Sequence, residues 1–119
     1  MLVFHAKELM EAQAKAGRAY REFLRTDAMS AGVYALPAGA EDKQKPHSED
    51  EIYYVLSGRA KFFSDGDGRP RNIDVHPGSV IFVGANADHR FHDITEDLVL
   101  LVFFGPAEGT RAKQGSKAK

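Results

Sequence analysis

His47 and Glu51 lie four residues apart at the start of a run of strand-forming residues, EIYYVLS. In extended backbone, residues of equal parity point to one face, so Lys45, His47, Glu51 and Tyr53 are expected to share a face. Tyr53 and Val55 indicate that this face is turned toward a core. Burying an imidazole and a carboxylate costs several kcal/mol unless each is paired, hydrogen-bonded or metal-bound. The pattern therefore predicts a buried polar site.

A further histidine, His89, follows the turn-forming residues GANAD and precedes Phe91 at the start of another predicted strand. From there it could converge on His47 and Glu51 across the interior of a barrel. Two imidazoles and one carboxylate would leave open positions on a divalent metal ion such as Fe(II), Mn(II), Ni(II) or Zn(II). Spacing alone does not establish a metal, so a metal-free polar site stays open as an alternative.

The residues around these side chains predict an all-β domain. From Ala19 onward, short runs of β-branched, aromatic and apolar residues are separated by Gly, Pro, Asp and Asn. These runs predict strands over residues 19–25, 31–37, 51–57, 59–64, 71–75, 79–83, 89–94 and 98–104. Such a series is typical of an antiparallel β-barrel or jelly roll. The last run, LVLLVFF, is apolar on both faces, which predicts that a partner sheet or a second subunit covers it and indicates a homodimer.

The two ends of the chain are expected to lie outside the barrel. Residues 6–16, AKELMEAQAKA, are good helix formers that stop at Gly17, so a short helix is predicted within an N-terminal segment of residues 1–18. The barrel would then span residues 19–105. Residues 106–119 are small, charged and nonperiodic, which predicts a flexible basic tail.

Length and composition limit the classes of function. A chain of 119 residues fits one domain, and a net charge of −1 favours neither nucleic acid nor anionic membrane as a partner. The absence of Cys leaves only His and carboxylate ligands for a metal. The apolar stretch after Met1 is too short for a signal peptide or a membrane span, so a cytoplasmic location is the default expectation.

Two stretches of the chain resemble the paired motifs of the cupin superfamily. The first motif is Gly, five residues, His, one residue, His, three or four residues, Glu, six residues, Gly. Its positions are filled here by Gly39, Lys45, His47, Glu51 and Gly58, with the spacing intact. The only departure is Lys45, which stands where the family has its first metal-binding His.

The second motif is Gly, five residues, Pro, one residue, Gly, two residues, His, three residues, Asn. Here Gly78, Gly84, Asn86, His89 and Asp93 fall at these positions. The replacements at Gly84 and Asn86 preserve turn-forming chemistry. A paired match at the correct spacing is a strong indication of the fold.

The resemblance implies a cupin-type barrel of six to eight antiparallel strands, often dimeric, with a small-molecule cavity at one mouth. It also implies the metal ligands His47, Glu51 and His89, with a fourth position that is vacant, filled by water or taken by Gln44. A lysine ammonium is a poor ligand because it must first lose its proton. In the alternative reading, Lys45 pairs with Glu51 and the barrel holds no metal.

Three functions are consistent with such a site. The first is a metal-dependent enzyme similar to cupin dioxygenases and isomerases that act on small polar, phenolic or sugar-derived compounds, with Tyr53 or Lys45 assisting proton transfer. The second is a non-catalytic, metal-free binding cupin in which Lys45 contacts an anionic ligand. The third is a structural barrel with a vestigial pocket. No motif specific to a named reaction is present, and one fold hosts many chemistries.

Overall fold

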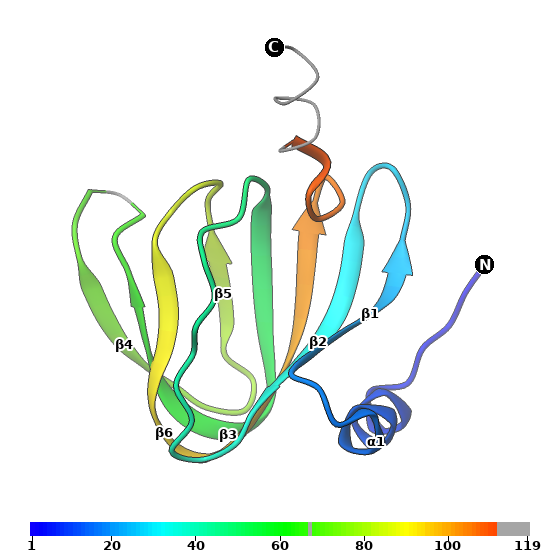
Figure 1. The fold of residues 1–119 in the computed structure, drawn as a ribbon, viewed down its shortest axis with the longest axis horizontal. Helices are drawn as coiled ribbons and strands as arrows, with labels where there is room; N and C mark the ends of the chain where they lie inside the picture. Colours follow the sequence, from blue (N-terminus) through cyan, green and yellow to red (C-terminus); the bar gives the residue numbers. More distant parts are fainter. Residues whose placement is uncertain (67, 112–119) are drawn as a thin grey trace.

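The computed structural model describes residues 1–66 and 68–111 as one helix followed by six strands (Figure 1). Their bounds are α1 (Ala6–Ala16), β1 (Tyr20–Arg25), β2 (Ser30–Leu36), β3 (Asp50–Ser64), β4 (Arg71–Val75), β5 (Val80–Val83) and β6 (His89–Gly105). The predicted all-β fold with one short N-terminal helix is confirmed. In the part of the chain that is described, no helix is both long and apolar enough to cross a membrane.

The sheet folds back on itself because the two long strands, β3 and β6, each belong to two walls of the barrel. The first half of β3 pairs with β5 and with the second half of β6, and β2 and β1 extend this wall. The second half of β3 pairs with β4 and with the first half of β6 to form the other wall. Figure 1 shows the two walls facing each other across the interior, as expected for a jelly roll.

Four of the eight predicted strands are merged into these two long strands. Three successive register shifts between Val55 and Lys61 bend β3 without ending its pairing with β6. At the bend, Gly58 has a φ of 94°, and a Cβ there would overlap the carbonyl oxygen of Asp97. The glycine that suggested a break between two strands therefore allows one strand to turn a corner against its neighbour.

Alternate residues along the strands fill the interior of the barrel. The largest fully buried side chains of this core include Tyr53, Phe91, Leu98 and Leu100. Outside the barrel, α1 lies beside β2, and Gln13 donates hydrogen bonds to the carbonyl oxygens of residues 18 and 19. The core is thus confined to the space between the two walls, where the side chain of Glu51 is also buried.

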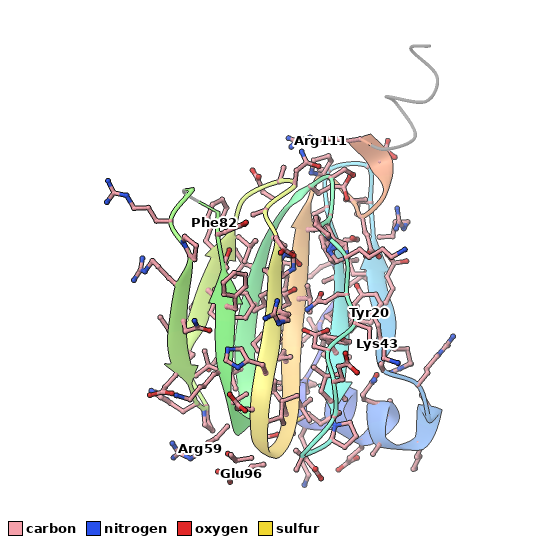
Figure 2. The ribbon with its side chains drawn as sticks, turned by 60° about the vertical axis from the view of Figure 1, so that its left-hand side comes forward. Tyr20, Lys43, Arg59, Phe82, Glu96 and Arg111 are labelled. Atoms are coloured by element: carbon pink, nitrogen blue, oxygen red, sulfur yellow. The ribbon has the colours of Figure 1, made fainter. Side chains whose placement is uncertain are left out.

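The segment that follows β6 is held against the barrel. The backbone nitrogen of Glu108 donates to Ser30 Oγ at 2.9 Å, and those of Gly109 and Arg111 donate to the Glu49 carboxylate at 2.8 and 3.0 Å. Figure 2 shows Arg111 at one end of the barrel, with Arg59 and Glu96 at the other. Residues 106–111 therefore differ from the flexible tail that was predicted. Residues 112–119 lie outside the described residues.

Candidate metal centre

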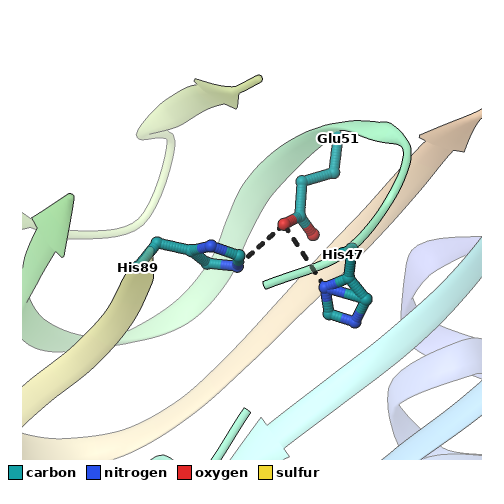
Figure 3. Close-up of side chains that lie close together, drawn as sticks. All are labelled: His47, Glu51 and His89. Atoms are coloured by element: carbon teal, nitrogen blue, oxygen red, sulfur yellow. Dashed lines mark ion pairs between the residues drawn. The ribbon is translucent and has the colours of Figure 1, made fainter. Parts of the chain in front are cut away.

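Three side chains from separate parts of the chain meet inside the barrel. Glu51 lies at the start of β3 on one wall, His89 begins β6 on the opposite wall, and His47 lies in the loop before β3. Glu51 Oε1 is 2.7 Å from His89 Nε2 and 3.6 Å from His47 Nδ1 (Figure 3). One possible ligand atom from each residue lies within 4.8 Å of the others. The structure thus brings together the three residues that were predicted as metal ligands.

The orientation of His89 favours a cation between its ring and Glu51. His89 is 1% exposed, and its Nδ1 lies 2.9 Å from the carbonyl oxygen of Ala87. A carbonyl oxygen can only accept, so Nδ1 carries the hydrogen and Nε2 of the neutral ring presents a lone pair to the carboxylate. Burial alone would lower the pKa of His89, but the bonds to Glu51 and Ala87 hold it above its ordinary value. A positive charge, from a proton or a metal ion, is therefore favoured at this point.

Two further polar atoms in the cluster are buried without a hydrogen-bond partner among the described residues. They are Glu51 Oε2 and His47 Nδ1. Such atoms are rare inside proteins because their loss of hydration is not compensated. Two imidazole nitrogens and a carboxylate with unused lone pairs are a donor set suited to Fe(II), Mn(II), Ni(II) or Zn(II). The residues present therefore fit a divalent metal ion.

His47 is held by Glu108, a residue that the sequence analysis did not single out. Glu108 Oε2 lies 3.1 Å from His47 Nε2, so a hydrogen on Nε2 would face this carboxylate while Nδ1 faces Glu51. Burial raises the pKa of Glu108, while the nearby His47 opposes this effect. In the sequence, the only signal of Glu108 is that it is the one acidic residue in a basic tail.

A chain of hydrogen bonds leads away from His89. The Tyr53 hydroxyl lies 3.0 Å from His89 Nε2 and donates to Gln44 Oε1 at 3.0 Å. Gln44 Nε2 donates in turn to Asp42 Oδ2 at 2.8 Å, and Asp42 also accepts from the hydroxyl of Tyr34. Burial and the neighbouring Glu51 raise the pKa of Tyr53 well above its ordinary value, so this phenol stays protonated. Gln44 therefore lies beside the cluster with its oxygen already engaged by Tyr53.

Lys45 does not lie where strand parity placed it. Residues 37–49 between β2 and β3 are irregular, so the alternation of side chains along a strand does not apply to them. Lys45 is exposed, and in residues 1–66 and 68–111 the ion-pair partners of Glu51 are His47 and His89. The predicted pairing of Lys45 with Glu51 is therefore not found in the described chain.

Glu49 is buried, although it precedes the strand in an irregular segment. Its carboxylate accepts from the hydroxyl of Ser48 and from two backbone nitrogens of the segment after β6. These bonds tie the residues around Glu108 to the loop that carries His47. Glu49 thus acts as a structural link between the two segments that meet at the cluster.

A cavity of about 150 Å³ opens beside the cluster. It is lined by Tyr20, Tyr34, Gln44, His47, Tyr53, Val102, Phe104 and Glu108. A larger cavity of about 270 Å³ lies between β4 and β5, but none of its lining residues belongs to the cluster. The smaller cavity is therefore the one in which a bound molecule could contact both His47 and Tyr53.

Comparisons with known proteins agree with these observations. The sequence model of the protein family described as "Cupin domain" matches residues 32–104 of this chain. The protein named "Uncharacterized protein SCO3923" from Streptomyces coelicolor is 45% identical over 108 residues, which are 91% of this chain and 99% of that protein. Acireductone dioxygenase from Bacillus cereus is 26% identical over 92 residues, which are 76% of this chain. That alignment covers 54% of the enzyme, so the chain spans about half the length of this relative.

Solved structures show the same fold. TT1209 from Thermus thermophilus superposes with a TM-score of 0.66 at 22% identity, over 90% of this chain and 99% of that one. The cupin domain of Cnp3 from Schizosaccharomyces pombe superposes with a TM-score of 0.64 at 14% identity, over 83% of this chain and 69% of that one. At these identities the similarity concerns the fold alone.

Proposed function

Because this chain belongs to the cupin family, we propose that it is a divalent-metal-dependent enzyme acting on a small molecule held beside His47, Glu51 and His89. The observation that carries this proposal is the buried Glu51 carboxylate between two imidazoles, with Glu51 Oε2 and His47 Nδ1 lacking hydrogen-bond partners among the described residues. A proton on His89 would satisfy only the contact of that ring with Glu51. A metal ion would satisfy all three side chains at once.

Each residue around the cluster has a defined part in this proposal. A divalent metal bound there would polarise a substrate oxygen and lower the pKa of a bound water or hydroxyl group. The Ala87 carbonyl fixes the tautomer of His89, and the Glu108 carboxylate fixes that of His47. Tyr53 keeps its proton and lies 3.0 Å from His89 Nε2, so its hydroxyl could turn from Gln44 to donate a hydrogen bond to an oxygen held at the cluster. We assign hydrogen-bond donation to Tyr53 and leave Lys45, which is exposed, without a part in this scheme.

The reaction class that we favour is oxygenation of a small, oxygen-bearing compound. A divalent metal held by His47, Glu51 and His89 would supply Lewis-acid and O₂-activating chemistry to a substrate oxygen at this site. The similarity to an enzyme named acireductone dioxygenase supports this class over isomerisation. The small cavity limits the substrate to a compact molecule.

A metal-free binding protein is the second candidate, and the raised pKa of His89 favours it. In that case a proton takes the place of the metal between His89 and Glu51, and the cavity binds its ligand without turnover. The metal content of the protein separates the two candidates.

Elemental analysis of untagged protein, after anaerobic reconstitution with Fe(II), Mn(II), Ni(II) or Zn(II) and desalting, tests the metal site. We expect about one metal ion per chain in wild type and in the control His5→Ala, which removes an exposed histidine. His89→Ala and Glu51→Gln should lose the metal. Wild type that retains no metal under any of these conditions would refute the proposal in favour of the metal-free candidate.

Turnover is tested separately on the metal-loaded protein. Oxygen uptake and product formation are followed with catechols, keto acids and uronates, beside the Glu51→Gln variant as a metal-free control. Oxygen uptake by wild type, without uptake by Glu51→Gln, supports an oxygenase. Binding without turnover across the whole panel would indicate a binding protein that happens to hold a metal.

We also propose that the chain forms a homodimer through the outer face of β5, β3 and β6. Val80 and Phe82 are 69% and 66% exposed, which is unusual for large apolar side chains. Strand pairing places them in two apolar rows, Phe82–Ile52–Phe103 and Val80–Tyr54–Leu101. A face without charged residues in these rows suits a permanent interface with a second copy of the chain. Sedimentation velocity should show a wild-type dimer and a Phe82→Asp monomer, and a monomeric wild type would refute the interface.

A further inference from the structure

We infer that the cavity beside the cluster selects an uncharged, single-ring molecule of the phenol or hydroxybenzamide class, and that Tyr20 determines this selectivity by donating a hydrogen bond to it. The inference rests on the proposed function, because it names the substrate class of the same site. Three features of the cavity carry it, namely an unsatisfied phenol, the charges that line the wall and the size of the cavity.

The unsatisfied phenol belongs to Tyr20, which lines the cavity and starts β1 (Figure 2). Its hydroxyl is buried and has no hydrogen-bond partner among the described residues. By contrast, the neighbouring Tyr34 donates to Asp42 at 2.6 Å. A buried hydroxyl without a partner is costly, and a ligand that accepts its hydrogen would remove this cost.

A glycine in the adjacent strand allows Tyr20 to occupy this place. Tyr20 pairs with Tyr34 across β1 and β2, and Gly32 lies two residues before Tyr34 on the same face of β2. A Cβ at Gly32 would overlap both the ring and the hydroxyl of Tyr20. The ring can therefore lie over β2 and reach the cavity only because position 32 carries no side chain.

The charges that line the cavity disfavour an anionic ligand. Among the lining residues the ionisable groups that can carry charge near neutral pH are Glu108 and His47, and none is Lys or Arg. Glu51 lies next to this wall through its contact with His47. The carboxylates of Glu51 and Glu108 together balance a divalent ion, so an anion would gain no net attraction from the metal-loaded site. Lys45, which could have contacted an anion, is exposed and does not line the cavity.

The size and the walls of the cavity favour one flat ring. Its volume of about 150 Å³ matches that of an engineered protein cavity that accommodates benzene. Tyr20, Tyr34, Tyr53 and Phe104 supply aromatic surface, which packs well against a planar ring. A sugar acid would lose this contact and bring an unmatched negative charge.

The charge preference of the cavity is tested with salicylamide and salicylate, which have similar shapes. Salicylamide carries an uncharged amide where salicylate carries a carboxylate. Calorimetric titration of the full-length, Zn(II)-loaded protein measures binding without turnover. We expect wild type to bind salicylamide about 10-fold or more tightly than salicylate, since one unfavourable charge contact costs at least this factor. Glu108→Gln should reduce the ratio between the affinities for salicylamide and salicylate, because it removes one negative charge from the cavity wall. Equal or tighter binding of salicylate by wild type, or no binding of either compound, would overturn the inference.

The part played by Tyr20 is tested with Tyr20→Phe, which removes only the hydroxyl. Loss of one hydrogen bond predicts about 3- to 10-fold weaker binding of salicylamide. The control Tyr54→Phe, on the outer face of β3, should bind as wild type does. Tyr20→Phe that binds salicylamide as tightly as wild type would exclude this assignment.

Metal analysis of the same samples keeps the two proposals apart. If wild type holds no zinc, the proposed metal-dependent function fails. The salicylamide titration of the metal-free protein, wild type beside Tyr20→Phe, then still decides whether Tyr20 binds the ligand. If zinc is present and the charge preference is absent, only the substrate class is refuted.

Discussion

Replacing Glu49 with glutamine should loosen the segment that positions His47. Glu49 is 1% exposed, and its two oxygens accept the backbone hydrogens of Gly109 and Arg111 at 2.8 and 3.0 Å. A glutamine keeps one accepting oxygen and turns an amide donor toward the other backbone donor. One hydrogen bond to a charged acceptor is therefore lost, and two donors are left facing each other.

The magnitude follows from the value of that bond. A hydrogen bond to a charged group contributes about 1.5–3 kcal/mol, so the segment should open roughly 10- to 150-fold more often in Glu49→Gln. Because residues 106–111 follow the last strand, this opening leaves the pairing of β3 with β6 intact. Glu108 moves with the segment and releases His47, and loss of such a supporting residue weakens metal binding by about 10- to 100-fold.

Amide hydrogen exchange measured by NMR checks this expectation. Protection of the Gly109 and Arg111 amides should fall in Glu49→Gln, while amides in the middle of β3 and β6 keep their wild-type protection. Glu41→Gln, which alters an exposed carboxylate in the same loop, serves as the control. Unchanged protection at both amides, or an equal loss throughout the barrel, would refute the assignment of Glu49 as a local link.

Three further outcomes are expected. Burial raises the pKa of Glu49, but the bonds from Ser48, Gly109 and Arg111 outweigh this and hold it below its ordinary value. A carboxyl group with a lowered folded-state pKa stabilises the fold above its unfolded-state pKa and loses that contribution as pH falls through the folded-state value. Urea unfolding of metal-free protein should therefore show a smaller loss of stability on acidification in Glu49→Gln than in wild type, and equal losses would contradict this. Gly58→Ala should lower the free energy of unfolding by about 1–3 kcal/mol in the same assay, because a Cβ there meets the Asp97 carbonyl at a positive φ. Gly84→Ala is the control, and equal stability of the two variants would refute this explanation. Lys45→Ala should leave the metal dissociation constant within about 2-fold of wild type, because Lys45 is an exposed side chain. A dissociation constant about tenfold or more above that of wild type would show that Lys45 supports the site.

Local sequence patterns were enough to identify the barrel and the three central residues of its site. The positions of apolar side chains along each strand indicate which face is buried, and this depends only on a period of two residues. Glu51 obeys that rule, since it shares the buried face of β3 with Tyr53. His47 and His89 were found by motif spacing, and the structure places both beside Glu51.

The same rule failed where the backbone is not extended. Lys45 lies in an irregular loop, where parity carries no information about direction, and its side chain is exposed. Gly58 was expected to separate the predicted strands over residues 51–57 and 59–64. Its positive φ instead lets β3 bend while β6 continues to pair with it.

Contacts between residues far apart in the chain were decided only by the tertiary structure. Glu108 reaches His47 because Glu49 binds the backbone beside it, and Tyr20 reaches the cavity because Gly32 carries no side chain. Neither relation leaves a periodic signal, since each depends on which segments the folded barrel brings together. Short motifs therefore identify the three residues of the cluster, whereas the residues that orient them and shape the cavity are determined by the packing of distant segments.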